Sequence, residues 1–140
     1  MRKVLLDTDI LSEYLKGHDP MVAGHAAVYF RFHRIFTFSS VTAYEIAYGL
    51  DVKNAESQFR KAMEWLRRNE EVTPASADYL SAASMKASAK KRGFIVELPG
   101  CLIASIALRF GLPLVTGNTA GYESIRKTGE PLVLQNWREA

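Results

Sequence analysis

Cysteine is nearly absent from this 140-residue sequence, which contains only Cys101. A single thiol excludes an intrachain disulfide and any zinc site built from several cysteines. No stretch approaches the roughly 20 apolar residues that a membrane-spanning helix requires. A basic, then apolar secretory leader is also missing at the N-terminus. We therefore expect a cytoplasmic protein that works in a reducing compartment.

Repeats, low-complexity stretches and linkers are absent as well, which predicts a single domain over residues 1–140. The sequence lacks a phosphate-binding Gly-x-x-x-x-Gly-Lys-[Ser/Thr] loop and a Gly-x-Gly-x-x-Gly turn. Its three histidines, His18, His25 and His33, have neither metal-ligand spacing nor the pattern of a serine or cysteine triad. These absences disfavour nucleotide-binding enzymes and triad hydrolases.

Short apolar runs alternate with helix-like patterns along the chain. Strands are expected at residues 4–6, 34–39, 114–116 and 131–134, and helices at 10–15, 20–32, 42–49, 55–68, 74–92 and 101–110. Strands separated by helices are typical of an α/β fold with a central, mainly parallel β-sheet flanked by α-helices.

Polar residues follow the predicted strands. Asp7, Asp9, Glu45 and Asn118 each lie just after a strand, and the carboxyl ends of parallel strands meet at one edge of a sheet. Carboxylates gathered there repel one another unless a cation lies between them, and oxygen ligands suit Mg²⁺. Such an ion would activate water for phosphodiester hydrolysis. The pattern favours metal-dependent phosphodiester chemistry.

Each of these residues also has a simpler interpretation. Asp7 and Asp9 could be turn and N-cap residues, and Asn118 could stabilise its own turn. Glu45 could complete a capping box with Thr42 at the start of a helix. The functional interpretation is favoured because separate turns would otherwise place acids and an amide at one edge by chance.

Positive charge clusters locally although the formal net charge is only +3. Lys86, Lys90, Lys91 and Arg92 fall within seven residues without an intervening acid, and Arg31, His33 and Arg34 form a second group. The first cluster is either the solvated C-terminal end of a helix or a contact for phosphates of a nucleic acid.

Four segments and a C-terminal dipeptide together resemble a known family. They are residues 4–11 (VLLDTDIL), 39–49 (SSVTAYEIAYG), 102–107 (LIASIA) and 111–118 (GLPLVTGN), with Asn136-Trp137 near the end. They resemble PIN-domain ribonucleases, and the length is similar to VapC-type toxins of toxin–antitoxin pairs. The resemblance implies a PIN-like fold and an endoribonuclease dependent on Mg²⁺ or Mn²⁺. It also implies a homodimer that a cognate antitoxin inhibits.

The resemblance assigns roles residue by residue. Asp7 matches the first metal-binding aspartate, and Glu45 matches the glutamate of the second motif. Thr116 and Asn118 match the fourth motif. The resemblance therefore implies catalytic roles for Asp7, Glu45 and Asn118, and metal binding by Asp7 and Glu45.

The sequence departs from the family at the third motif, where Gly100 replaces an aspartate. Gly121 likewise stands where a further acid is often found. Losing a carboxylate should weaken metal affinity and slow cleavage, unless Glu97 or Asp9 compensates. The alternative is an inactive PIN-like protein that serves as an antitoxin- or RNA-binding module.

A different enzyme class also begins with a strand that ends in Asp-x-Asp. In a haloacid-dehalogenase-like phosphatase, Asp7 and Asp9 would be the nucleophile and the acid. No adjacent acidic pair follows a later strand, and the chain leaves little room for a cap domain. The sequence therefore disfavours this alternative.

Overall fold

The computed structural model describes residues 1–126 and 129–140. Its strands are β1 (Leu5–Leu6), β2 (Thr37–Ser39), β3 (Glu70–Val72), β4 (Leu114–Val115) and β5 (Leu134–Gln135). Its helices are α1 (Thr8–Lys16), α2 (Pro20–His33), α3 (Ser40–Val52), α4 (Glu56–Arg67), α5 (Ser76–Lys91), α6 (Leu98–Phe110) and α7 (Thr119–Arg126). Strands and helices alternate over most of the chain, as the sequence predicts.

The five strands form one parallel sheet in the order β3-β2-β1-β4-β5. In the central strand β1, Leu6 pairs with Phe38 of β2 and with Val115 of β4. All three side chains are fully or almost fully buried, as expected for a parallel sheet covered on both faces. The predicted α/β fold is therefore confirmed.

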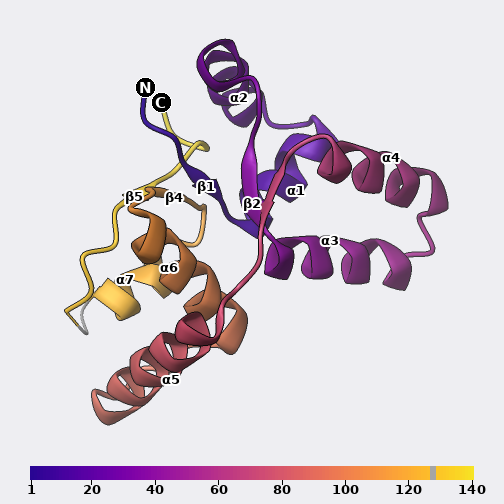
Figure 1. Ribbon diagram of the computed structural model, residues 1–140. Coiled ribbons are helices and arrows are strands. Elements are labelled where there is room, and N and C mark those ends of the chain that lie inside the picture. The colour runs from indigo at the N-terminus through magenta and orange to yellow at the C-terminus, as the bar shows by residue number, and fades with distance from the viewer. Residues whose placement is uncertain (127–128) are drawn as a thin grey trace.

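Helices cover the two faces of the sheet in separate groups (Figure 1). On one face, Leu5 and Leu114 pack into a core with residues of α5, α6 and α7. On the other face, Leu6 and Val115 pack into a second core with residues of α1 to α4. The alternation of side chains along each strand produces this division, because successive residues point to opposite faces.

The start of α3 differs from the capping box predicted at Thr42. The helix begins at Ser40, and the Ser39 hydroxyl accepts a hydrogen bond from the Thr42 backbone N–H at 3.2 Å. Thr42 is consequently inside the first turn, with its hydroxyl buried. Glu45 therefore does not reach back to a Thr42 cap, and its carboxylate serves another contact.

Other boundaries also differ from the sequence prediction. Helix α6 begins at Leu98, three residues before the predicted start, with Pro99 in its first turn. Helix α5 begins at Ser76, because the Asp78 carboxylate accepts a hydrogen bond from the Ala75 N–H and so sets the first turn there. The last strand lies at Leu134–Gln135, where its pairing with β4 places it. Strand β3 and helix α7 were not predicted.

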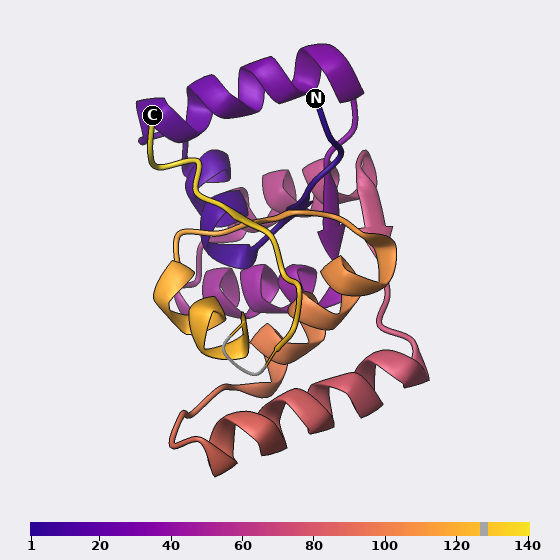
Figure 2. The same ribbon diagram turned by 90° about the vertical axis from the view of Figure 1, so that its left-hand side faces the viewer.

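The C-terminal segment returns across the molecule to end beside α2 (Figure 2). Trp137 is buried and its ring stacks on His25 of α2, with ring centroids 6.0 Å apart. The His25 ring also hydrogen-bonds the Glu139 carbonyl at 2.7 Å. These contacts fix the position of Arg138 near the carboxyl edge of the sheet. Within the described residues, no helix has the length and apolar character needed to cross a membrane.

Candidate active site

Asp7 lies at the carboxyl end of the central strand and begins α1 as its N-cap. Its backbone N–H donates to the Val115 carbonyl at 2.9 Å, which continues the pairing of β1 with β4. One carboxylate oxygen accepts from the Thr8 backbone N–H at 2.9 Å. The other accepts from the Thr116 hydroxyl at 2.8 Å. The side chain is thus held rigidly with only 7% of the residue exposed.

This environment raises the pKa of Asp7 from 3.8 to about 6. Burial is the main cause, because it disfavours the charged form. The hydrogen bond from Thr116 acts in the opposite direction, and the negative charge of Asp9 raises the pKa further. A cation bound at Asp7 would therefore reduce the free-energy cost of keeping this buried carboxylate ionised.

Glu45 approaches Asp7 through a shared residue, Thr8. The Thr8 hydroxyl hydrogen-bonds the Glu45 carboxylate at 2.6 Å, and the Thr8 N–H donates to Asp7. A further hydrogen bond of 2.9 Å joins the hydroxyls of Thr8 and Thr42. The structure therefore brings Asp7 and Glu45, the acids of the first and second motifs, together where α1 meets α3. We call this pair of acids the acidic corner.

Asp9 faces the adjacent loop after β4. Its carboxylate accepts from the Ile10 N–H at 2.8 Å and from the Gly117 N–H at 2.9 Å. The Arg138 guanidinium lies 4.0 Å from the same carboxylate. A Cβ at Gly117 would come within 2.5 Å of that guanidinium, so the glycine leaves room for it. Sequence reasoning missed Arg138, because 129 positions separate it from Asp9.

Asn118 stabilises its own turn in this structure. Its side-chain oxygen accepts from the Gly121 N–H at 3.3 Å, and the residue is exposed at the start of α7. Its backbone N–H donates to the Thr116 hydroxyl at 3.0 Å, and that hydroxyl in turn donates to Asp7. Asn118 is thus linked to Asp7 by its backbone N–H, through the Thr116 hydroxyl, and not by its side-chain amide.

Tyr122 is a site residue that sequence reasoning missed. It is 4% exposed, and its phenol lies close enough to Asp7 to lower the pKa of that carboxyl group. Burial, together with the Asp7 charge, raises the pKa of Tyr122 well above its usual value, so the phenol keeps its proton. Tyr122 lies four residues after Asn118, a spacing that places both on one side of a helix. Because the sequence did not predict α7, this spacing could not be used to bring the tyrosine to the site.

Glu97 and Asp9, the two acids that could replace the missing third-motif aspartate, lie in different parts of the structure. Gly100 is in the first turn of α6, and Glu97 precedes that helix as its exposed N-cap. The charge of Glu97 acts on the Cys101 thiol, whereas the acid that acts on Asp7 is Asp9. Within residues 1–126 and 129–140, no three acidic, histidine or cysteine side chains converge as a metal centre. The carboxylate oxygens of Asp7 and Glu45 are thus of the type that a hard cation prefers, but the site offers few of them.

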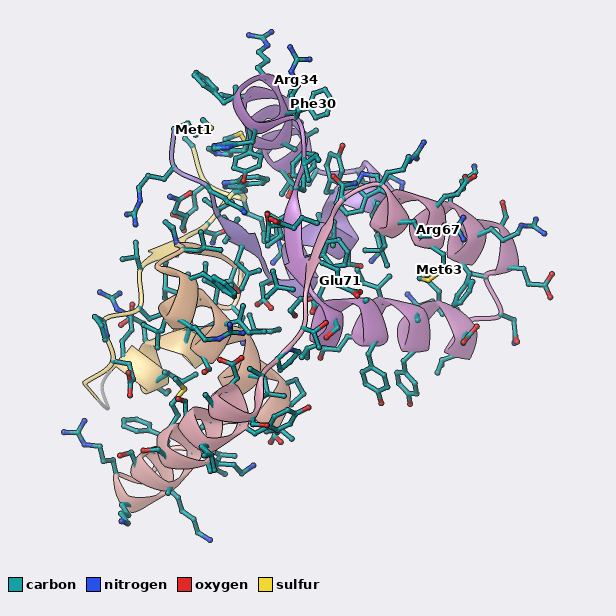
Figure 3. All side chains as sticks on the ribbon, viewed as in Figure 1. Met1, Phe30, Arg34, Met63, Arg67 and Glu71 are labelled. Carbon is teal, nitrogen blue, oxygen red and sulfur yellow. The ribbon has the colours of Figure 1, made fainter. Side chains whose placement is uncertain are left out.

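The two basic groups lie at the ends of helices. Lys90 and Lys91 are in the last turn of α5, as the simpler interpretation predicts. Arg34 ends α2 ahead of the amino end of β2, and its guanidinium lies 5.8 Å from the Phe30 ring centroid (Figure 3). Asp7 is at the opposite, carboxyl edge of the sheet. The second group is therefore remote from the acidic corner.

The sheet order and this corner define an α/β protein whose polar site lies at the carboxyl ends of its central strands. The sequence identifies the family: residues 4–127 match the PIN domain, and the chain belongs to this family. No curated protein matches the sequence. The resemblance seen in the motifs is thus confirmed.

Solved structures share the fold at low sequence identity. A chain of the VapBC2 complex from Rickettsia felis, bound to a promoter DNA fragment, is 22% identical and superposes with a TM-score of 0.80 over 97% of this chain and 99% of that one. For a DNA-bound VapBC complex from Salmonella typhimurium the identity is 22%, the TM-score 0.81 and the coverage 98% and 99%. A chain of VapBC-1 from nontypeable Haemophilus influenzae is also 22% identical, with a TM-score of 0.78 over 99% of this chain and 100% of that one.

Proposed function

We propose that this chain is a toxin-type endoribonuclease that depends on Mg²⁺ or Mn²⁺ and is inhibited by a cognate antitoxin. The observation that carries the proposal is the linked pair of acids, Asp7 and Glu45, at the carboxyl edge of a PIN-domain sheet. Asp7 is a buried carboxylate with a raised pKa, and no cationic side chain among the described residues contacts it directly, which is typical of a functional site. Membership in the PIN family supports the same class.

Asp7 and Glu45 would hold the divalent cation in this proposal. When bound, the cation would supply an activated water and neutralise charge on the scissile phosphate. Thr8 fixes both acids, because its N–H and its hydroxyl bond one carboxylate each. Asn118 positions the Thr116 hydroxyl, which orients the second oxygen of Asp7.

The proposed partners are the RNA substrate, the antitoxin and a second copy of the chain. The similar structures come from VapBC complexes, which supports an antitoxin as a partner. Exposed apolar side chains that a partner protein would cover include Tyr44 and Tyr48, which stack with centroids 6.3 Å apart on α3. We propose that the 140 residues act as one PIN domain in the cytoplasm, consistent with a single, buried cysteine.

A second candidate function is a binding module of the same fold with weak or absent catalysis. The observation that favours it is Gly100, which leaves the acidic corner without a third converging acid in the described chain. Such a protein would keep its antitoxin- or RNA-binding surface. Its partner affinity would not depend on Asp7.

Cleavage of purified total RNA by the isolated protein tests the proposal directly. The reaction should run with Mg²⁺, with Mn²⁺ and with a chelator, beside the variants Asp7→Asn, Glu45→Gln and Gly100→Asp. Metal-dependent cutting that is lost in the first two variants supports the nuclease. Activity restricted to Gly100→Asp favours the binding module. Silence from every variant excludes the nuclease.

A further inference from the structure

Arg138 lies in the C-terminal segment, and contacts on both sides of it hold this segment in place. Its backbone N–H donates to the Asn136 side-chain oxygen at 3.0 Å. On one side the Trp137 ring is buried and stacks on His25. On the other side the Glu139 carbonyl hydrogen-bonds the His25 ring at 2.7 Å. The main chain is therefore fixed at Arg138 before any ligand binds, and none of these contacts uses the guanidinium.

The guanidinium of Arg138 is only loosely paired. It approaches Asp9, but the distance of 4.0 Å between Nη1 and Oδ2 is too long for a hydrogen bond. Asp9 does not depend on it, because its carboxylate accepts from the backbone N–H groups of Ile10 and Gly117. Within residues 1–126 and 129–140, no acceptor hydrogen-bonds this guanidinium, and 41% of the side chain is exposed. Its N–H groups are thus available to a ligand from solution.

The same guanidinium rests against the backbone beside the acidic corner. A Cβ at Gly117 would lie 2.5 Å from Nη1 of Arg138, so the close approach requires a glycine there. Gly117 directly follows Thr116, whose hydroxyl donates to Asp7 at 2.8 Å. In the described part of the chain, Arg138 makes no ion pair or hydrogen bond with Asp7 itself. Arg138 therefore flanks the acidic corner without entering it.

A fixed guanidinium in this position suits an anionic strand. Asp7, Asp9 and Glu45 place negative charge where an RNA backbone would have to approach, and this charge repels phosphates. Arg138 contributes positive charge at the edge of the same region. The planar fork of a guanidinium matches two phosphate oxygens, and an ordered main chain lowers the entropy lost on binding. A phosphate is thus the ligand that this side chain fits.

We propose that Arg138 binds a backbone phosphate of an RNA strand that lies across the acidic corner. The assignment rests on the proposed function, which makes RNA the substrate. Because Arg138 contacts Asp9 and Gly117 rather than Asp7, the phosphate that it binds is a neighbour of the scissile one. Arg138 is therefore a substrate-binding residue that holds the strand, and it takes no part in bond cleavage.

The test is RNA binding in a chelator, which prevents metal-dependent cleavage. The anisotropy of a labelled single-stranded RNA of mixed sequence is measured at several KCl concentrations. The full-length chain is compared with Arg138→Ala, Arg138→Lys and Arg31→Ala. Arg31 is the matched control, because it is an exposed arginine in the last turn of α2, remote from the acidic corner.

We expect Arg138→Ala to raise the dissociation constant for RNA by about threefold to thirtyfold. The slope of log affinity against log salt concentration should become less steep by about 0.7, the value for one phosphate contact with a single strand. Arg138→Lys should keep the slope, because the charge remains, but lose part of the affinity with the fork. Arg31→Ala should change the affinity by less than about twofold.

Cleavage kinetics and melting supply two further readouts. With Mn²⁺, Arg138→Ala should raise KM and change kcat by less than about threefold, because the contact is equally strong before and during bond cleavage. Its melting temperature should fall by less than about 3 °C, since the contacts of Trp137 and Asn136 remain and an exposed ion pair contributes little. A larger fall with an unchanged salt slope would show a structural role and overturn the proposal.

Unchanged RNA affinity and salt slope in Arg138→Ala would overturn the assignment and leave the guanidinium to an acidic protein partner. An equal loss in Arg31→Ala, or no RNA binding by the unaltered chain, would overturn it too. Each of these results leaves the proposed nuclease intact if the unaltered chain cuts RNA. Conversely, RNA binding that depends on Arg138, with no cleavage by any chain, would support the contact and refute the nuclease. The two failures are therefore distinguishable.

Discussion

Asp7 and Asp78 are both buried, with exposed fractions of 7% and 1%, yet their pKa values move in opposite directions. Burial raises the pKa of both carboxyl groups. For Asp78 this is outweighed by hydrogen bonds, first from Arg109 and then from the Ala75 N–H and the Ser105 hydroxyl. For Asp7 the hydrogen-bond donors within the described part of the chain, the Thr8 N–H and the Thr116 hydroxyl, are neutral, and the nearby charge of Asp9 adds to the effect of burial.

The difference separates an acid with a structural partner from the acid that we propose binds a metal ion. Arg109 binds both oxygens of Asp78, with Nη2 at 2.7 Å from Oδ2 and Nε at 3.0 Å from Oδ1. This pair joins α5 to α6 and leaves no charge to be balanced from outside. Asp7 keeps a carboxylate whose ionisation is costly, and a divalent cation bound beside it would reduce that cost.

The largest effect expected from this comparison is on RNA cleavage. Asp7→Asn should reduce cleavage by at least about 100-fold, because an amide replaces a proposed metal-binding carboxylate. Asp78→Asn should leave cleavage almost unchanged at temperatures well below its melting point. Gel assays of both variants, with melting curves to verify folding, make the measurement. Equal losses in the two variants would refute the distinction.

The next effect is on stability and concerns the arginine. Arg109→Ala should lower the free energy of unfolding by about 2–4 kcal/mol, because Asp78 is then buried without its charged partner. Urea unfolding at neutral pH measures this change. The control is Lys3→Ala, which removes an exposed ion pair with Glu70 and should cost less than about 1 kcal/mol. A small loss for Arg109→Ala would show that Ser105 and Ala75 alone can hold Asp78.

A smaller and pH-dependent effect is expected for Asp7 itself in the absence of metal. Its folded-state pKa of about 6 lies above the usual 3.8, so the native protein binds more protons than the unfolded chain between these values. The stability that this group contributes is therefore present below pH 3.8 and lost as the pH rises through 6. Asp7→Asn should stabilise the protein at pH 8 by up to about 3 kcal/mol, and much less near pH 4.

Unfolding curves in a chelator at several pH values make this measurement. Asp9→Asn is the companion variant, because removing its charge should lower the pKa of Asp7 and shift the transition to lower pH. A stability difference between the Asp7→Asn and unaltered chains that stays constant from pH 4 to pH 8 would mean that Asp7 titrates normally.

Local sequence patterns predicted the elements that are defined by buried apolar residues. Strand β1 and helix α4 were found because apolar runs and three- to four-residue spacings specify them directly. Strand β3 was missed, because its two glutamates are exposed and pairing with β2 creates it at the sheet edge. Helix α7 was missed because its eight residues include Gly121 and follow a polar turn.

The acidic corner could be predicted in part for a related reason. Asp7 was identifiable because it directly follows a buried strand, and Glu45 through its motif. Tyr122 and Arg138 were not, because their approach to Asp7 and Asp9 depends on how α7 and the C-terminal segment fold back. The sequence around a tyrosine or an arginine does not indicate which carboxylate the side chain approaches in the folded protein.

The smallest effect expected concerns Asn118 and tests whether its amide acts in the site or in the turn. Asn118→Ala should cost about 1 kcal/mol, because the Gly121 N–H loses its acceptor at the start of α7. Asn118→Asp should retain the cap and most of the stability. Because the Asn118 backbone N–H still holds Thr116 in both variants, cleavage should fall by less than about tenfold. A loss as large as that of Asp7→Asn would instead place the amide in direct contact with the reacting groups.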